Sequence, residues 1–427
     1  MELTHEMEQA FELIETTNDP IFITGKAGSG KTTFLQYVVK HTKKQCVVAA
    51  PTGIAAIHAG GCTLHSLFNL PFAPVTPLDK LSVKINGYKM HLIKNIELLI
   101  IDEVSMVRPD ILDTIDRRLR FIRRAKEPFG GVQVVMFGDL FQLPPVVKRD
   151  DKEILSAYYH NFYFFSALVF RNIGFRVVEL THIFRQTDKE FVNILNHIRS
   201  YHIENEELDM LSELRDKDKA GNYNNDHIHI CTHRYEVDKI NQTMLGSYSH
   251  TYKAILDGQF SESSMPCDME LNLRIGARVM ALANNREKKY YNGMLGYVIG
   301  LDEDKVTAKM DNGNIILFTQ NTWENTQYEV AEGKVTSSVI GTCKQIPLTL
   351  AWAITVHKSQ GLTFDKIVLH ASRTFCPGQL YVALSRCRTM DGIVSDSYIT
   401  KQMILPSKEL AEFERQYQQD GYYQGLI

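Results

Sequence analysis

Short apolar runs alternate with polar or glycine-rich turns through the first part of the chain. Four of them, at residues 21–24, 45–50, 97–101 and 131–137, have the length and composition of buried strands. Helical patterns lie between at least some of these runs, and each run leads into a polar, glycine-rich or acidic turn. This order predicts parallel strands joined by crossover helices. Ligands bind such sheets beyond the carboxyl ends of the strands, so the four turns are candidates for one site.

The hydrophobic pattern changes character twice in the rest of the chain. Residues 70–87 carry three prolines spaced three positions apart, which favours an extended excursion over a helix. Residues 274–342 contain several short strand candidates and the hairpin-turn sequence Asp-Asn-Gly, so they predict a small β-barrel inserted into a second domain. The α/β pattern resumes near residue 347, and a helical pattern follows at 407–418.

Composition and charge narrow the class of protein. The chain has 427 residues, of which 44% are hydrophobic and 23% charged, so it is globular and long enough for two or more domains. Its 47 basic and 50 acidic residues give a net charge of −3, which excludes nucleic-acid binding through bulk basicity but permits a basic groove. Seven scattered cysteines without a Cys-x-x-Cys pair predict buried thiols in a reducing cytoplasm. We expect neither a signal peptide nor a membrane span, because the N-terminus is acidic and no 18-residue stretch is uninterruptedly apolar.

The most specific motif is Gly-x-x-x-x-Gly-Lys-Thr at residues 25–32, between a strand pattern and a helix pattern. Its glycines allow backbone N–H groups at the start of the helix to converge on phosphate oxygens. In such a motif the lysine, here Lys31, reaches the β- and γ-phosphates of ATP, and the hydroxyl of Thr32 binds Mg²⁺. The residues expected to hold ATP are therefore Gly28, Ser29, Gly30, Lys31 and Thr32.

Two further strand ends carry groups suited to phosphate chemistry. Asp102 and Glu103 follow an apolar strand, where adjacent carboxylates are costly to desolvate without a cation. We expect Asp102 to hold Mg²⁺ and Glu103 to polarise the attacking water, which favours hydrolysis over transfer to a substrate hydroxyl. After the next strand, Gln142 is suited to sense the γ-phosphate or its attacking water, and Asp139 to hold the turn or the metal's water shell. A proline-braced structural turn is the alternative for this segment.

Arg185 and Arg386 are candidates for the clamp on the charge of the transition state. Both follow the phosphate loop by more than 150 residues, and guanidinium is the favoured partner for phosphate charge. If both belong to a second domain, ATP would draw two domains together. Either arginine could instead form an ordinary surface ion pair.

Several stretches have residue types that contact nucleic acid. The candidate side chains are Thr63, His65, Ser66, Phe68, Trp352, His357, Lys358 and Ser359. Phe68 and Trp352 are candidate stacking platforms, although core packing is an equal alternative for Phe68 and the favoured one for Trp352. The aromatic run at 158–165 is more typical of a packed linker between domains, and the basic run at 117–126 is more typical of a solvated helix face.

Taken in order, these blocks resemble the PIF (petite integration frequency) family of superfamily-one helicases, which are related to RecD and Dda. The matching blocks are GKAGSGKTT, APTGIAAIHAGGCTLHSLF, IIDEVSMV, FGDLFQLPPV, LTHIFRQTDKEFVNILNHIR, WAITVHKSQGLTFD and GQLYVALSRCR. Residues 180–199 look like the family's own signature. The resemblance runs from Gln9 to about Arg388, and it is closest in extent to the minimal helicase core of bacterial members.

The resemblance implies an α/β fold with two RecA-like parallel-sheet domains. Domain 1A would cover residues 1–165, with a wedge insertion, 1B, at about 69–90. Domain 2A would cover residues 166–273 and 343–427. An SH3-like β-barrel, 2B, would be inserted at 274–342.

The resemblance also implies a 5′→3′ DNA helicase and single-strand translocase that uses ATP and Mg²⁺. Its substrates would be single strands, forked or partial duplexes and G-quadruplexes. It would work as a monomer that can dimerise on DNA, in the bacterial cytoplasm with the nucleoid and without a membrane partner. Arg185 and Arg386 would be the phosphate-sensing arginines. The residues that the resemblance adds are Gln9 at adenine, Thr33 and Gly361 at ATP, and Thr52 at the single strand.

Other classes stay open on the motifs alone. A P-loop kinase would phosphorylate a small molecule, although Glu103 and the two distant arginines argue against it. A non-catalytic nucleotide switch is disfavoured because every catalytic part is present. A translocase that moves on DNA without unwinding it would carry the same motifs.

Overall fold

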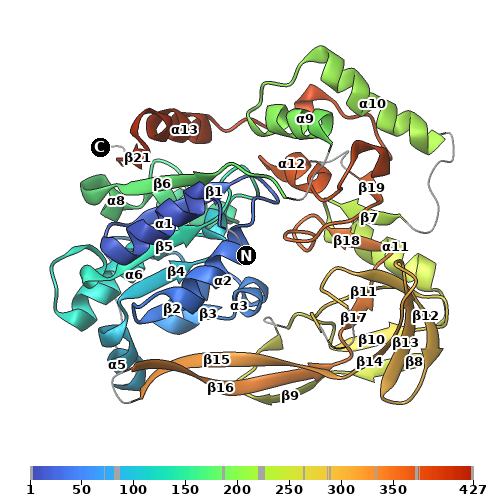
Figure 1. The fold of residues 1–427 in the computed structure, drawn as a ribbon, viewed down its shortest axis with the longest axis horizontal. Helices are drawn as coiled ribbons and strands as arrows, with labels where there is room; N and C mark the ends of the chain where they lie inside the picture. The colour runs from blue at the N-terminus through green and yellow to red at the C-terminus, as the bar shows by residue number, and fades with distance from the viewer. Residues whose placement is uncertain are drawn as a thin grey trace. The chain divides into compact units, whose positions relative to one another are not determined.

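The computed structural model describes residues 3–71, 73–80, 87–184, 188–219, 227–262, 265–285, 287, 290–331, 334–370, 374 and 376–424. The chain divides into two compact units by contact. Unit 1 comprises Met1–Phe184, Asn325–Ile340 and Ser407–Ile427, and unit 2 comprises Arg185–Glu324 and Gly341–Pro406. Each unit contains a parallel sheet of its own (Figure 1).

The parallel sheet of unit 1 has seven strands in the order β21-β6-β1-β5-β4-β2-β3. The strands are β1 (Ile21–Gly25), β2 (Cys46–Ala50), β3 (Cys62–Thr63), β4 (Leu98–Ile101), β5 (Gln133–Phe137), β6 (Phe175–Leu180) and β21 (Tyr422–Tyr423). All neighbours pair in parallel except β21, which is antiparallel to β6. The four predicted strands are confirmed as β1, β2, β4 and β5. Every residue of β1, β4 and β5 is buried, which explains why they read as continuous apolar runs.

Helices cover this sheet and connect its strands (Figure 1). They are α1 (His5–Thr16), α2 (Lys31–His41), α3 (Gly53–Ala59), α4 (Leu64–Phe68), α5 (Gly87–Asn95), η1 (Val104–Met106), α6 (Pro109–Arg123), η2 (Pro128–Gly131), α7 (Arg149–Leu155), η3 (Phe164–Ser166), α8 (Leu168–Ile173) and α13 (Lys408–Asp420). The first helix shows how its pattern folds: Thr4 Oγ1 accepts a hydrogen bond from the Met7 N–H and caps α1. Its apolar side, including Ala10 and Ile14, is buried in the core of unit 1.

The predicted end of the first domain at residue 165 is wrong. β6 pairs in parallel with β1, with Ile21 opposite Arg176, so it belongs to the sheet of unit 1. The structural reason is that β1 lies inside the sheet and needs a partner on each edge. β21 in turn pairs with β6, and Phe413 of α13 stacks on Phe165 with ring centroids 4.6 Å apart. Residues 166–184 and 407–424 therefore lie in unit 1 and not in the second domain.

The aromatic run at 158–165 belongs to the interior of unit 1 and is not a linker between domains. Phe164 packs edge-to-face on Phe22 of β1 with centroids 5.0 Å apart. Phe164 and Phe165 are 0% and 2% exposed. Edge-to-face and stacked rings in this number stabilise a core beyond the area that they bury.

Unit 2 contains a four-stranded parallel sheet in the order β18-β7-β19-β20 and a separate β-rich part. Its helices are α9 (Lys189–Arg199), α10 (Asn205–Lys219), α11 (Arg234–Leu245), α12 (Gln379–Leu384), η5 (Met390–Gly392) and η6 (Lys401–Met403). The four strands of this sheet are β7 (Ile228–Cys231), β18 (Ala353–Thr355), β19 (Ile367–His370) and β20 (Ile393–Ser395).

The β-rich part contains a five-stranded antiparallel sheet in the order β14-β13-β12-β11-β17. The strands of this part are β8 (His250–Lys253), β9 (Ile255–Gly258), β10 (Glu270–Leu273), β11 (Arg278–Ala281), β12 (Leu295–Leu301), β13 (Lys305–Met310), β14 (Ile315–Thr319) and β17 (Leu348–Leu350). Two long strands follow β14, β15 (Asn321–Ala331) and β16 (Lys334–Gln345), and their residues 325–340 are counted with unit 1. The predicted turn forms: Gly313 has φ +86° and its N–H donates to Met310 O at 2.8 Å. Trp352 is buried in the core of this sheet, so it packs and does not stack on a base.

The boundaries predicted for the barrel differ from this sheet in two ways. β17 completes the sheet although it lies beyond residue 342, and β15 and β16 form a separate three-stranded sheet with β9. The SH3-like character of the insertion stays a prediction.

The aromatic interior predicts the effect of one substitution. Replacing Phe165 with alanine removes a ring that stacks on Phe413, and we expect the free energy of unfolding to fall by about 3–5 kcal/mol. Urea unfolding followed by circular dichroism measures the change. Phe121→Ala is the control, because that ring is 60% exposed on α6. Similar effects of the two substitutions would contradict this account of the core.

Candidate active site

Three neighbouring strands of unit 1 end at one edge of the sheet, and each is followed by residues predicted to act on phosphate. In the parallel register Ile21 lies opposite Val135, and Ile100 lies opposite the same Val135. The carboxyl ends of β1, β5 and β4 therefore lie side by side. The structure thus brings together the phosphate loop, the pair Asp102 and Glu103, and the turn that ends at Gln142.

The phosphate loop has a backbone that only glycine permits. Gly25 has φ +156°, and a Cβ there would lie 2.6 Å from Ser29 Oγ and 2.7 Å from Leu180 O. Gly30 has φ +83° and precedes α2 without a side-chain cap for the first N–H groups of the helix. Ser29 is 1% exposed, and in the described part of the chain its hydroxyl has no hydrogen-bond partner. Uncapped helix N–H groups beside an unsatisfied buried hydroxyl fit the phosphate oxygens of a nucleotide.

The charged groups of the loop fit a nucleotide with a cation. Lys31 Nζ donates to Gly25 O at 2.6 Å and to Lys26 O at 3.1 Å, so the ammonium lies over the loop. Burial raises the pKa of Asp102 to about 6, and the charge of Lys31 offsets only part of this effect. A cation at Asp102 would favour its ionised form. No group of three or more His, Cys, Asp and Glu able to hold a metal occurs among the described residues.

Glu103 is held in an uncommon backbone conformation. Its φ of +51° and ψ of +44° lie in the left-handed region, which costs of order 1–3 kcal/mol for a residue with a side chain. The surrounding contacts enforce it: the Glu103 N–H donates to Asp102 Oδ1 at 3.0 Å, and a Cβ on Gly138 would lie 3.1 Å from Val104 Cγ1. Glu103 is half-buried at the edge of the sheet. Such strain at a strand end is typical of a residue placed for chemistry.

Asp139 and Gln142 form one buried turn after β5. Gln142 Nε2 donates to Asp139 Oδ2 at 3.2 Å, and the Phe141 N–H donates to Asp139 Oδ1 at 3.1 Å. Asp139 is 1% exposed and Gln142 is 7% exposed. Asp139 therefore holds the turn, which is one of the two roles predicted for it, and fixes the amide of Gln142.

Side chains of α1 and of the segment after β6 approach the phosphate loop from outside the motif. Gln9 is exposed on α1, with its Nε2 3.0 Å from His5 Nε2, and Met7 of the same helix would lie 3.2 Å from a Cβ on Gly30. Phe184 was not predicted. Its N–H donates to Gly28 O at 2.9 Å, its ring lies against Gly30, and it is 55% exposed. The sequence signal that could have identified Phe184 is its position as an aromatic residue directly before Arg185, a predicted phosphate contact.

Of the two arginines predicted to sense phosphate, the structure describes only Arg386. Arg386 is 1% exposed, and its Nε donates to Val382 O at 2.8 Å while Nη2 donates to Ser385 Oγ at 2.8 Å. In this conformation its guanidinium is inside unit 2, and its predicted contact with ATP stays a prediction. Arg185 lies outside the described residues. Gly361, predicted to contact ATP, is in unit 2 with φ +80° and no atom within 4 Å of a Cβ position.

In unit 1 the predicted single-strand contacts lie after β2 and after its neighbour β3, the edge strand of the sheet. Thr52 Oγ1 accepts the Ala55 N–H at 3.2 Å and caps α3, and Thr63 Oγ1 accepts the Ser66 N–H at 3.1 Å and caps α4. Ser66 is exposed and His65 is half-buried, and burial lowers the pKa of His65. Phe68 is 0% exposed, so its predicted stacking on a base is wrong and core packing holds it.

In unit 2 the corresponding stretch follows β18, which is also an edge strand. The Lys358 N–H donates to Thr355 Oγ1 at 3.1 Å, and the Lys358 side chain is exposed. His357 is half-buried, and burial lowers its pKa, so the ring is a neutral hydrogen-bonding group. Ser359 is 0% exposed and its hydroxyl donates to Val356 O at 2.7 Å, so the predicted contact of this side chain with DNA is wrong in this conformation.

Comparison with known proteins decides the family. A model of the PIF1-like helicase family matches residues 2–209. The curated ATP-dependent DNA helicase Pif1 of Campylobacter jejuni is 34% identical over 397 residues, which cover 86% of this chain and 86% of the relative. This chain belongs to the PIF1-like helicase family.

Solved structures agree with this assignment. Bacteroides sp Pif1 in complex with ADP-AlF4 is 58% identical, covers 100% of each chain and superposes with a TM-score of 0.95. Bacteroides Pif1 bound to ssDNA is also 58% identical over 100% of each chain, with a TM-score of 0.74. The expectation of an α/β fold with RecA-like domains is confirmed. The chain is an ATP-dependent DNA helicase, which decides against the kinase and the non-catalytic switch.

The described part of the chain contains no helix that is long and apolar enough to span a membrane.

The phosphate loop predicts the effect of one glycine substitution. Gly25→Ala places a Cβ against Leu180 O and Ser29 Oγ, so we expect ATP affinity to fall by about tenfold or more, because strained backbone costs of order 1–3 kcal/mol. Titration with a fluorescent ATP analogue measures this affinity. Gly87→Ala is the control, because no atom lies within 4 Å of its Cβ position. Unchanged affinity in Gly25→Ala would contradict the close-approach argument.

Proposed function

We propose that this helicase moves 5′→3′ along single-stranded DNA and opens forked or partial duplexes and G-quadruplexes. The observation that carries the proposal of movement driven by ATP is the strained Glu103 beside the half-buried Asp102, at the sheet edge that also bears the phosphate loop. The ssDNA-bound structure of the Bacteroides relative supports a single strand as the partner. We propose that the protein works as a monomer that can dimerise on DNA, and that it acts on DNA in the bacterial cytoplasm, with the nucleoid.

Hydrolysis follows from the groups at the edge of the sheet. The N–H groups of the loop and Lys31 bind the phosphates, and the Glu103 carboxylate takes a proton from the water that attacks the γ-phosphate. Gln142 orients this water, because Asp139 fixes its amide. Thr32 and Asp102 would hold Mg²⁺, which supplies charge stabilisation at the β- and γ-phosphates.

Single-strand binding would use both units. Thr52 follows β2 and Thr63 and Ser66 follow the edge strand β3 of unit 1, and His357 and Lys358 follow the edge strand β18 of unit 2. Hydroxyl groups, neutral imidazoles and an ammonium at strand ends suit phosphate oxygens without reading sequence. Opening one base-pair step costs on average about 1.4 kcal/mol, so one nucleotide moved per ATP is energetically permissible.

We also propose that Phe184 stacks on the adenine ring. It is a half-exposed aromatic side chain tied to the loop by the hydrogen bond from its N–H to Gly28 O. Gln9, on the helix that contacts Gly30 through Met7, would hydrogen-bond the adenine edge.

The role of Glu103 predicts a separation of binding from hydrolysis. Glu103→Gln keeps the size of the side chain but removes the base, so we expect the DNA-stimulated turnover to fall by about 10²-fold or more. ATP binding should stay within about twofold of wild type, because the amide preserves the local packing. Steady-state ATP hydrolysis with and without a short single-stranded oligonucleotide, beside a nucleotide titration, measures both. Wild-type turnover in Glu103→Gln would refute the base assignment.

The role of Phe184 predicts a change in KM. Phe184→Ala removes a stacking surface worth about 1–3 kcal/mol, so we expect KM for ATP to rise by about fivefold to a hundredfold with little change in kcat. Phe184→Tyr keeps the ring and should retain the wild-type KM. The result that would count against stacking is an equal loss in both variants, or a fall in kcat alone.

A further inference from the structure

The first limb of the proposed wedge, residues 73–80, is called the strap here. Val75 is its one buried residue, whereas Leu78 is 79% exposed. A cavity of about 260 Å³ lies beside it, and its lining includes Val75, Pro77, Arg117 and Tyr159. Apolar packing therefore holds the strap at a single point. Its position on unit 1 depends on polar contacts.

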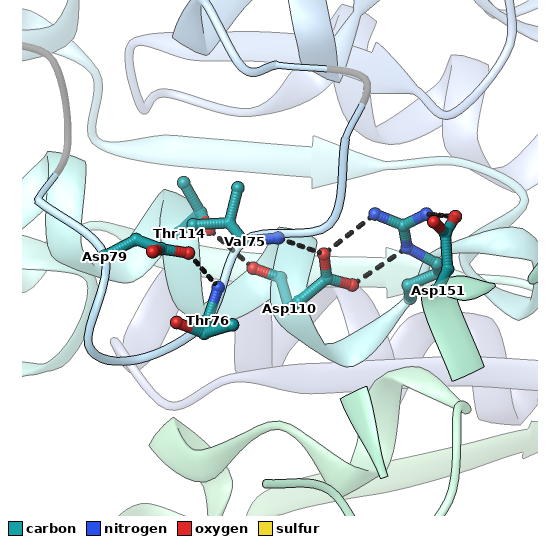
Figure 2. A network of polar contacts seen from close by, with 7 residues as sticks. Val75, Thr76, Asp79, Asp110, Thr114 and Asp151 are labelled. Carbon is teal, nitrogen blue, oxygen red and sulfur yellow. Dashed lines mark hydrogen bonds and ion pairs between the residues drawn. The ribbon is translucent and has the colours of Figure 1, made fainter. Parts of the chain in front are cut away.

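Asp110 of α6 makes the first of these contacts (Figure 2). Its carboxylate is 0% exposed and accepts the Val75 N–H at 3.2 Å. Arg108 holds the same carboxylate through two bonds, from Nε at 2.9 Å and from Nη2 at 2.8 Å, and Nη1 lies 3.5 Å from Asp151. The Thr114 hydroxyl donates to Asp110 O at 2.6 Å. Arg108 thus fixes the carboxylate that receives the strap, and Thr114 bonds to the backbone of the same residue.

Arg117, two turns further along α6, makes the second contact. Its Nη1 donates to Thr76 O at 3.1 Å, and its Nη2 donates to Asp79 O. These two carbonyls belong to the first and last residues of one turn of the strap. In this turn the Thr76 N–H donates to Asp79 Oδ2 at 2.7 Å (Figure 2). The Asp79 N–H in turn donates to Thr76 O at 3.1 Å. A planar guanidinium with one N–H group on each carbonyl fixes the direction of the turn as well as its distance.

The same helix also holds the chain on the other side of the insertion. Arg123 Nη1 donates to the carbonyls of Lys94 at 2.7 Å and Ile96 at 2.9 Å, at the end of α5. Arg118 Nη2 donates to Asn69 O at 3.0 Å, just before the insertion. The basic run at 117–126, predicted to be a solvated face, instead binds backbone carbonyls. α6 begins at Pro109, six residues after Glu103.

We propose that Arg117 and Asp110 are positioning residues for strand separation, because they hold the strap in a fixed place on the unit that binds ATP. The proposal rests on the proposed function and on the wedge that the sequence resemblance implies at about residues 69–90. A wedge opens base pairs only if it does not yield when the duplex pushes back. The positioning residues leave ATP hydrolysis and single-strand movement unchanged, and they determine how many base pairs open for each ATP.

The test compares two arginines of one helix. Arg117→Gln removes the fork that holds the strap. Arg120→Gln is the matched control, because Arg120 bonds to Asp116 Oδ1 at 2.9 Å and Lys126 O at 3.0 Å, at the end of its own helix. DNA-stimulated ATP turnover, translocation along a single strand and opening of a forked duplex are measured on the same full-length preparations.

We expect Arg117→Gln to lower the rate of duplex opening by about tenfold to a hundredfold, as misplacing a distant positioning group does. Its turnover and translocation should stay within about twofold of wild type, and Arg120→Gln should leave all three readouts within that range. Arg117→Lys can reach one carbonyl at a time, so its opening rate should lie between those of wild type and Arg117→Gln.

Asp79→Ala is the second variant and guards against a folding defect. Its carboxylate is exposed and closes the turn through the Thr76 N–H, so the variant should fold and should show a smaller, selective loss of duplex opening.

Three outcomes would overturn the proposal. Duplex opening at the wild-type rate in Arg117→Gln is the first. The second is an equal loss of all three readouts in Arg117→Gln together with unchanged duplex opening in Asp79→Ala, which would mean a general structural role. A wild-type protein that turns over ATP on single strands but opens no duplex is the third, and it alone would also contradict the proposed function.

Discussion

The pairing of β1 between β5 and β6 is the constraint on which the active site depends. Parallel pairing with β5, and of β5 with β4, sets the phosphate loop, Glu103 and Gln142 at one edge of the sheet. Pairing with β6 brings Leu180 O against Gly25 and leads the chain to Phe184, which bonds to the loop. Backbone hydrogen bonds of the sheet thus determine where each reacting group lies. The side chains at these strand ends then supply the charged groups of the site.

α6 links this edge to the proposed wedge. It begins shortly after Glu103, and its polar side chains hold the strap through Asp110 and Arg117 and the end of α5 through Arg123. Most of these acceptors are backbone carbonyls, so the contacts depend on the path of the chain more than on the identity of its residues. Under our proposal, this connection keeps the wedge in place while the protein moves along a strand toward a fork.

The sequence predicted what is encoded locally and missed what depends on the fold. Apolar runs followed by glycine or acidic turns identify β1, β2, β4 and β5, and the phosphate loop carries its own backbone signal in glycines. The position of β6 was missed because it is set by the edge of a strand some 150 residues earlier. Phe68, Ser359 and Arg386 have residue types that suit DNA or phosphate, yet all three are buried. Residue type does not report exposure. Phe184 was missed because its place beside the loop depends on the fold, through the hydrogen bond from its N–H to Gly28 O.

The most direct test of the account is duplex opening by the wild-type protein on forks that carry either a 5′ or a 3′ single-stranded tail, with ATP hydrolysis recorded in the same reactions. The account predicts that ATP is hydrolysed on both substrates, because both offer a single strand, and that only the fork with the 5′ tail is opened. Opening that starts from the 3′ tail would contradict the proposed polarity. Rapid hydrolysis with no strand displaced on either fork would contradict the central claim that ATP turnover in unit 1 drives strand separation.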